Sequence, residues 1–157
     1  RYVIQQRAAR PALYSHRATW VRQELDIGAM HTAAQALLGE NDFSSFRSAA
    51  CQSEHAMRFV ESVKVTAEGP FVYIDIRANA FLHHMVRNIV GSLLQVGTGE
   101  QPVSWIAELM ALKDRTRAGP TAPAQGLYLV AVQYPSEHKL PDSGIVPRFG
   151  TVDQLIY

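Results

Sequence analysis

The chain has 157 residues, 47% of them hydrophobic, which is enough for one domain with a core of its own. Its apolar runs are shorter than the roughly 18 to 20 residues of a membrane helix and no signal-peptide pattern opens the sequence, so we expect a soluble protein. A formal net charge of +1 decides nothing about nucleic acid, because phosphate recognition usually leaves a clearly basic footprint. The single cysteine, Cys51, excludes an internal disulfide and a cysteine-based zinc site, which fits a reducing cytoplasm.

The chain opens with Arg1-Tyr2-Val3-Ile4, an apolar, β-prone run without a leading methionine. This start is typical of the middle of a strand, so we expect a fragment of a longer protein. A long loop should follow, because Arg10-Pro11 and the polar residues after it disfavour helix. Arginine is frequent in this segment, at Arg1, Arg7, Arg10, Arg17 and Arg22. Arginine can bind phosphate through two hydrogen bonds, but a run of charge is more often only a solvated surface.

The central part of the chain carries one helix signal and two strand signals. Asp26 is a plausible N-cap for a first helix, whose apolar residues keep helical spacing until Gly39. Residues 58–66 alternate as a half-buried strand, and residues 71–77 are rich in β-branched and aromatic side chains. Glu68-Gly69-Pro70 turns the chain between them, so the two strands should pair as an antiparallel hairpin.

Periodicity predicts a second helix over about 82–96 and a third over about 103–113, with glycines between them. Residues 127–132 form a short, continuous apolar run that suits a central strand. The predicted order is β-α-β-β-α-α-β, and the fold class is α+β, with an antiparallel sheet and helices packed on one face. We expect residues 1–135 to form the folded domain and residues 136–157 an extended tail.

The second predicted helix carries an unusual cation. Projected at about 100° per residue, the helix has a broad apolar arc with Arg87 at one margin, whereas His84 and Asn88 fall on the polar side. A guanidinium at the rim of an apolar face needs an anion. From physics alone, that anion is an acid of the same chain, such as Asp75 or Glu108.

Two other chemistries have little support. His83 and His84 suggest a metal site, but neighbouring residues point to different sides of a helix and no third ligand lies one turn away. Serine, histidine and aspartate are all present, yet no G-x-S-x-G elbow positions a nucleophile. A small hydrolase that uses one of these histidines is therefore the weakest interpretation, and we expect no metal.

Residues 81–91, Phe-Leu-His-His-Met-Val-Arg-Asn-Ile-Val-Gly, resemble the C-terminal signature of the tRNA pseudouridine synthase A family. Three more stretches resemble this family in the expected order: Gly39 to Arg47, Asp114 to Ala124 and Gly126 to Val130. The resemblance covers nearly the whole chain except the residues after 135. It implies that residues 1–135 are the C-terminal half of a pseudouridine synthase catalytic domain.

The nucleophile of that family is an aspartate in a Gly-Arg-Thr-Asp-Ala-Gly-type motif, which this chain lacks. Asp114-Arg115-Thr116 has its aspartate before Arg-Thr instead of after it, so we do not assign Asp114 as the nucleophile. The resemblance makes Arg87 the salt-bridge partner of the missing aspartate. It also implies a cytoplasmic homodimer that binds tRNA and isomerises uridine to pseudouridine in the anticodon stem-loop without a cofactor. The chain alone should be inactive.

The resemblance further implies a pocket for the target base, which must leave its stack. The candidate pocket residues are Tyr2, Phe43, Phe46 and Leu127, although the two phenylalanines could also be simple core. The candidate RNA contacts are Arg7, Arg10, His84 and Asn88. The alternative function is a non-catalytic RNA-binding or dimerisation module of α+β type. An ion pair of Arg87 within this chain would favour that module, and a guanidinium facing an open cleft would favour the synthase.

Overall fold

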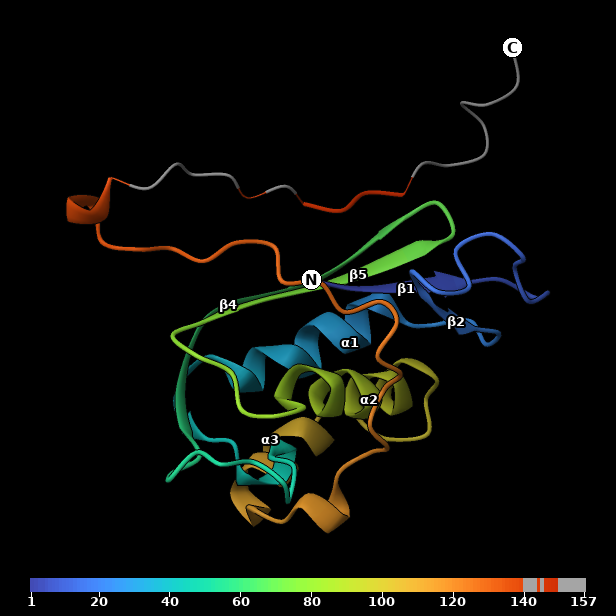
Figure 1. Ribbon diagram of the computed structural model, residues 1–157. Helices are drawn as coiled ribbons and strands as arrows, with labels where there is room; N and C mark the ends of the chain where they lie inside the picture. Colours follow the sequence, from blue (N-terminus) through green and yellow to red (C-terminus); the bar gives the residue numbers. More distant parts are fainter. Residues whose placement is uncertain (140–143, 145, 150–157) are drawn as a thin grey trace.

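The computed structural model describes residues 1–139, 144 and 146–149. A five-stranded sheet lies over a layer of helices (Figure 1). The strands are β1 (Tyr2–Gln6), β2 (Thr19–Val21), β3 (Gly39–Asp42), β4 (Met57–Glu68) and β5 (Phe71–Ala78). The α-helices are α1 (Ile27–Ala34), α2 (Met85–Gly97) and α3 (Trp105–Leu112), and 3-10 helices cover Gln35–Leu37, Ser44–Phe46, Arg115–Arg117 and Ser136–His138. Within these described residues, no helix combines the length and the apolarity needed to cross a membrane.

The sheet has the strand order β2-β1-β5-β4-β3. The predicted hairpin is confirmed: β4 and β5 pair antiparallel, with Glu68 opposite Phe71 and Gly69 at a φ of 54° in the turn. The expectation of a wholly antiparallel sheet is wrong, because β2 runs parallel to β1 after the loop of residues 7–18. The short strands β2 and β3 were not predicted either. The fold is therefore α+β with a mixed sheet.

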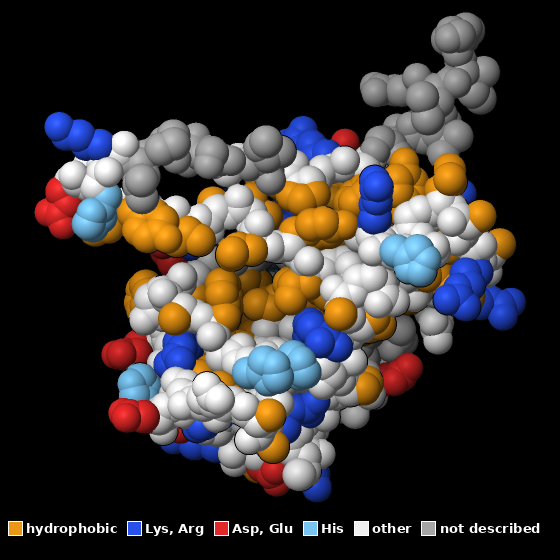
Figure 2. All heavy atoms as spheres, viewed as in Figure 1, with side chains coloured by type: hydrophobic (Ala, Val, Ile, Leu, Met, Phe, Trp, Pro, Cys, Tyr) orange, Lys and Arg blue, Asp and Glu red, His pale blue; other side chains and the backbone are white. Residues whose placement is uncertain are grey.

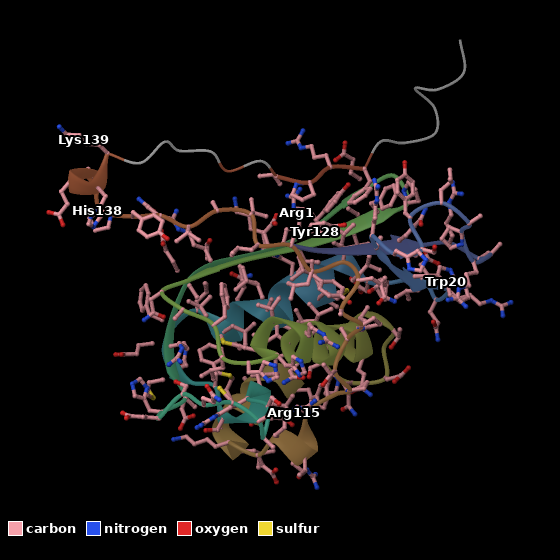
Figure 3. The ribbon with its side chains drawn as sticks, in the orientation of Figure 1. Arg1, Trp20, Arg115, Tyr128, His138 and Lys139 are labelled. Carbon is pink, nitrogen blue, oxygen red and sulfur yellow. The ribbon has the colours of Figure 1, made fainter. Side chains whose placement is uncertain are left out.

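Residues 127–132 do not form the predicted central strand. Leu127 makes an isolated bridge with Tyr2, and the backbones of Tyr128 and Arg1 exchange hydrogen bonds of 2.8 and 3.0 Å (Figure 3). Beyond Tyr128, the run pairs with no strand of the described residues. Leu129 and Val132 are consequently exposed. The run ends at the sheet margin instead of filling its centre.

The main core lies between the sheet and the helices. Asp26 caps α1 as predicted, since its carboxylate accepts a hydrogen bond of 2.8 Å from the backbone N–H of Ala29. The start of α2 differs from the prediction: the helix begins at Met85, because His84 has a left-handed φ of 61° that no α-helical residue adopts. The third helix likewise begins at Trp105, two residues later than predicted. The first turn of α2 is thus the place where a loop enters the helical layer.

A smaller hydrophobic cluster covers the opposite face of the sheet. It contains Val3, Ala18, Phe71 and Tyr73, with Tyr14, Tyr128 and Phe149 packed against them. The ring of Phe149 lies with its centroid 5.2 Å from that of Tyr14 and 5.4 Å from that of Phe71. Figure 1 shows residues 146–149 on this side, away from the helices. Of the predicted extended tail, residues 140–143, 145 and 150–157 lie outside the described residues.

Candidate functional site

The guanidinium of Arg87 is held by a single backbone segment. Arg87 lies in the first turn of α2 and is half-buried. Its Nε donates a hydrogen bond of 2.7 Å to the carbonyl oxygen of Ala122, and the N–H of Ala122 donates one of 3.1 Å to the carbonyl oxygen of Arg87. Because Nε is used, the two terminal nitrogens form the free edge of the guanidinium. Among the described residues they have no hydrogen-bond partner.

Arg87 does not form either ion pair that physics alone suggested. Asp75 is bound by the side chain of Arg1, whose Nε and Nη2 donate to its two carboxylate oxygens at 2.8 Å. Glu108 accepts a hydrogen bond from Ser104 at 2.8 Å. In the described part of the chain, no carboxylate lies within salt-bridge distance of Arg87. The cation is therefore oriented but not neutralised.

The surroundings of Arg87 are electropositive. Loss of solvent lowers the pKa of His84, and the nearby charges of His83, Arg87 and Arg115 lower it further. The two histidine rings stack with their centroids 3.9 Å apart. The expectation that they point to different sides was wrong, because His84 precedes the helix in a left-handed conformation. A positive field of this kind favours an anion near the start of α2.

Asn88 is not on a solvent-facing side, contrary to the helical projection. Only 1% of its surface is exposed. Its Nδ2 donates to the carbonyl oxygen of Phe46 at 2.8 Å, and its Oδ1 accepts from Thr121 at 2.7 Å and from Arg115 at 3.1 Å. The projection failed because the segment around Thr121 packs over this side of α2. All the contacts of the Asn88 side chain are therefore internal.

The candidate pocket residues separate into buried and exposed ones. Tyr2, Phe43 and Phe46 have 0% exposure and belong to the main core, so they present no surface to a base in this structure. The hydroxyl of Tyr2 donates to the carbonyl oxygen of Pro123 at 2.7 Å and contacts Thr19 Oγ1 at 2.5 Å. Burial raises the pKa of Tyr2 to about 12. Leu127 is 40% exposed and pairs with Tyr2 through an isolated β-bridge.

A hollow is visible on one face of the molecule (Figure 2). Figure 2 shows hydrophobic side chains lining it between the sheet and the helical layer, with basic and histidine side chains on its helical rim. The partly buried hydrophobic residues that β5 and α2 pack against the main core are Ile76, Ala78, Val86 and Leu94. An apolar hollow with cationic side chains on its rim can accept a planar ring and an anionic group together.

The arginine-rich loop between β1 and β2 is arranged differently. The side chains of Arg7 and Arg10 are exposed and, among the described residues, donate no hydrogen bond. The loop is fixed through its backbone: Trp20 Nε1 donates to the carbonyl oxygen of Arg7 at 2.8 Å, and the Tyr128 hydroxyl donates to that of Arg17 at 2.6 Å. Arg10 and Trp20 also border a cavity of about 100 Å³. The loop thus offers positive charge near the β2 side of the molecule (Figure 3).

Sequence reasoning missed Arg115, Thr121 and Ser92, which join the segment of residues 115–122 to α2. The signal that could have found them is Gly91, a glycine inside a predicted helix. Such a glycine indicates that another backbone comes close. Here a Cβ at position 91 would lie 1.7 Å from the carbonyl oxygen of Pro120.

The family model and the curated relatives that match this chain carry the same description. A family model described as tRNA pseudouridine synthase matches residues 33–135. A protein of Xanthomonas campestris pv. campestris (strain B100) named tRNA pseudouridine synthase A is 59% identical over 141 residues, which are 90% of this chain and 55% of that protein. A protein of the same name from Hydrogenovibrio crunogenus is 57% identical over 141 residues, or 90% of this chain and 54% of the relative. The chain spans about half the length of the curated relatives it matches.

Proposed function

Since the chain belongs to the tRNA pseudouridine synthase family, we propose that it forms one wall of the active site of an enzyme that isomerises uridine to pseudouridine in the anticodon arm of tRNA. The observation that carries this proposal is the Arg87 guanidinium. It is aimed by the carbonyl oxygen of Ala122 and has no carboxylate partner in the described residues. A half-buried cation of this kind needs an anion, which we assign to a nucleophilic aspartate outside residues 1–157.

The reaction cleaves the N-glycosidic bond of uridine, rotates the detached base and rejoins it through carbon, so substrate and product have the same atoms. Arg87 positions and does not react. Its free terminal nitrogens would hold the aspartate through two hydrogen bonds, which keeps the carboxylate ionised and fixes its orientation for attack. The electropositive surroundings of His84 support the same ionised form.

The substrate would approach over the apolar hollow. We assign Leu127 to the pocket wall, because it is exposed beside the buried Tyr2. Tyr2, Phe43 and Phe46 would support this wall from the core. Arg7, Arg10 and His84 would contact RNA phosphates. Asn88 would not, because its side chain is used in internal hydrogen bonds, and it would instead support the site from within.

Residues 1–135 would be the C-terminal half of the catalytic domain, followed by a tail of residues 136–157. The family resemblance also supports a cytoplasmic homodimer in the full-length protein. The competing interpretation, a non-catalytic RNA-binding or dimerisation module, would leave Arg87 paired within the chain. The synthase is favoured over this module because the terminal nitrogens of Arg87 have no partner among the described residues.

The test is pseudouridine formation on an unmodified tRNA transcript, measured with residues 1–157 alone and again after a separately produced N-terminal half is added. We expect no product from residues 1–157 alone and product from the mixture. The matched control is the same N-terminal half without residues 1–157. Product from residues 1–157 alone would mean that an aspartate of this chain is the nucleophile, and the proposal would be wrong.

A further inference from the structure

The segment that aims Arg87 is itself fixed by one face of α2. Gly91 and Ser92 follow Asn88 by three and four residues, so both lie on the side of the helix that carries Asn88. Ser92 Oγ accepts a hydrogen bond of 3.0 Å from the N–H of Gly119, and Asn88 Oδ1 accepts one of 2.7 Å from Thr121. Both Asn88 and Ser92 are at least 99% buried. Two buried side chains of α2 thus hold the segment just before Ala122, Ser92 through the backbone of Gly119 and Asn88 through the hydroxyl of Thr121.

The close approach at Gly91 limits how this segment can move. A Cβ at position 91 would come within 1.7 Å of the carbonyl oxygen of Pro120, and one at Gly119 would come within 2.9 Å of the carbonyl oxygen of Gly91. Two backbones in contact leave no side chain that could shift to absorb a displacement. The carbonyl oxygen of Ala122 therefore stays in place only while the whole segment of residues 118–122 does.

Arg115 commits its guanidinium to this segment. Its Nη1 lies 3.1 Å from the carbonyl oxygen of Gly119, and its Nη2 donates to Thr121 Oγ1 at 3.0 Å and to Asn88 Oδ1 at 3.1 Å. Arg117, two residues later, is exposed, and within the described part of the chain its side chain has no hydrogen-bond partner. A guanidinium whose donors already serve internal acceptors is poorly placed to bind phosphate as well. These two arginines are therefore a natural pair of test and control.

We propose that Arg115 and Thr121, joined through Asn88, are positioning residues for Arg87. They fix the loop whose Ala122 carbonyl oxygen orients the Arg87 guanidinium toward the carboxylate it serves. This rests on the proposed function, because the orientation matters for turnover only if Arg87 meets that carboxylate. Arg115 is then a structural arginine and not an RNA contact, unlike the exposed Arg117 two residues later, which is free to bind RNA.

Kinetics of the full-length protein separate positioning from RNA contact. Thr121→Val removes the hydroxyl with little change of volume and should lower kcat about 10-fold to 100-fold, because a small misplacement of a catalytic group has effects of this size. Thr121→Ser keeps the hydroxyl and should restore kcat. Arg115→Met should behave like Thr121→Val, with KM for tRNA and the salt dependence of KM unchanged. The matched control Arg117→Met should keep kcat.

A phosphate contact would produce the opposite pattern. Losing one reduces the slope of log affinity against log salt by about 0.7 to 1. If Arg115→Met raises KM, reduces that slope and keeps kcat, Arg115 binds RNA and the proposal is wrong. Unchanged kinetics in both Thr121→Val and Arg115→Met would also overturn it. Should Arg115→Met fail to fold, the comparison of Thr121→Val with Thr121→Ser still tests the positioning role.

A second readout does not depend on activity. The Nε–H signal of Arg87 in a ¹H–¹⁵N spectrum can be assigned by its loss in Arg87→Lys, and its hydrogen exchange reports the bond to Ala122. We expect slow exchange in the wild type and in Thr121→Ser, and faster exchange in Thr121→Val. Slow exchange in Thr121→Val would mean that Thr121 does not position Arg87, and the proposal would be wrong even if the enzyme makes pseudouridine. If the wild type makes no pseudouridine, the proposed function fails while the exchange result still stands.

Discussion

Two groups of arginines in this chain differ in what holds them. Arg87 and Arg115 are half-buried, and their donors bind carbonyl and amide oxygens at 2.7 to 3.1 Å. Arg7 and Arg10 are exposed on a loop and, within the described residues, their side chains have no partner. On the proposed function, we expect the first pair to provide geometry and the second pair to provide charge. Changes at the first pair should therefore alter turnover or stability, and changes at the second should alter affinity for RNA.

The largest effect is expected at Arg87. In the full-length protein, Arg87→Ala should lower kcat by about 100-fold to 1,000-fold, because the proposed function makes Arg87 the preorganised partner of the reacting carboxylate. The melting temperature should fall by only a few degrees, because the losses are limited to the hydrogen bond to Ala122 and the contact with the proposed aspartate. Arg87→Lys keeps the charge but not the flat, two-pronged edge, so its kcat should be intermediate. Wild-type turnover in Arg87→Ala would remove the distinction between the two arginine groups.

The next largest effect is on stability. Gly91→Ala should destabilise the protein by about 3 kcal/mol, because its Cβ would meet the backbone at Pro120 and the segment behind Ala122 must shift. The matched control is Gly97→Ala on the same helix, whose Cβ would meet the flexible side chain of Met30. Urea titration should show a clearly smaller loss for Gly97→Ala. Equal losses would mean that the segment is not fixed tightly against α2.

A moderate effect is expected at Tyr2, whose hydroxyl bonds the carbonyl oxygen of Pro123, next to Ala122. Tyr2→Phe should lower the free energy of unfolding by about 1 to 2 kcal/mol at pH 8, because buried partners lose a hydrogen bond.

The pKa of Tyr2 also predicts a pH dependence. Burial raises it from 10.0 to about 12. As pH rises, Tyr2 therefore loses its proton in the unfolded chain before it does so in the folded one. The stabilisation that the buried, protonated Tyr2 provides is complete below pH 10 and is lost as pH rises from 10 to about 12. Denaturant titrations over this range should show a smaller decline for Tyr2→Phe than for wild type. Parallel declines would indicate that Tyr2 is accessible to solvent, as a pocket residue would be.

The smallest effect is expected in the loop. Replacing Arg7 and Arg10 together with alanine should raise KM for tRNA several-fold and reduce the salt slope by about 1 to 2, with kcat unchanged. Lys139→Ala is the control, because Lys139 is an exposed cation at the opposite end of the molecule from Trp20 (Figure 3). A fall in kcat without a change of KM in the double variant would show that the loop also contributes geometry.

The sequence predicted what depends on local signals. The β4–β5 hairpin follows from strand alternation and the Gly69 turn, and the start of α1 follows from the Asp26 cap. The marginal position of Arg87 on α2 was also predictable, because apolar periodicity fixes the buried face of a helix.

What failed depends on neighbours that are distant in sequence. Asn88 is buried by residues 115–122, and the run after Leu127 lacks a strand beside it. The start of α2 was misplaced because His84 adopts a left-handed conformation, which side-chain periodicity does not reveal. The family resemblance pointed to Arg87 but not to the residues that orient it, since those act through the backbone of Ala122.

A crystal structure of the full-length protein tests most directly whether Arg87 serves a carboxylate from outside this chain. We predict that an aspartate oxygen from beyond residues 1–157 lies within about 4 Å of the terminal nitrogens of Arg87, while Nε still donates to the carbonyl oxygen of Ala122. Arg87 paired with an acid of residues 1–157, or its terminal nitrogens facing only solvent, would contradict the account.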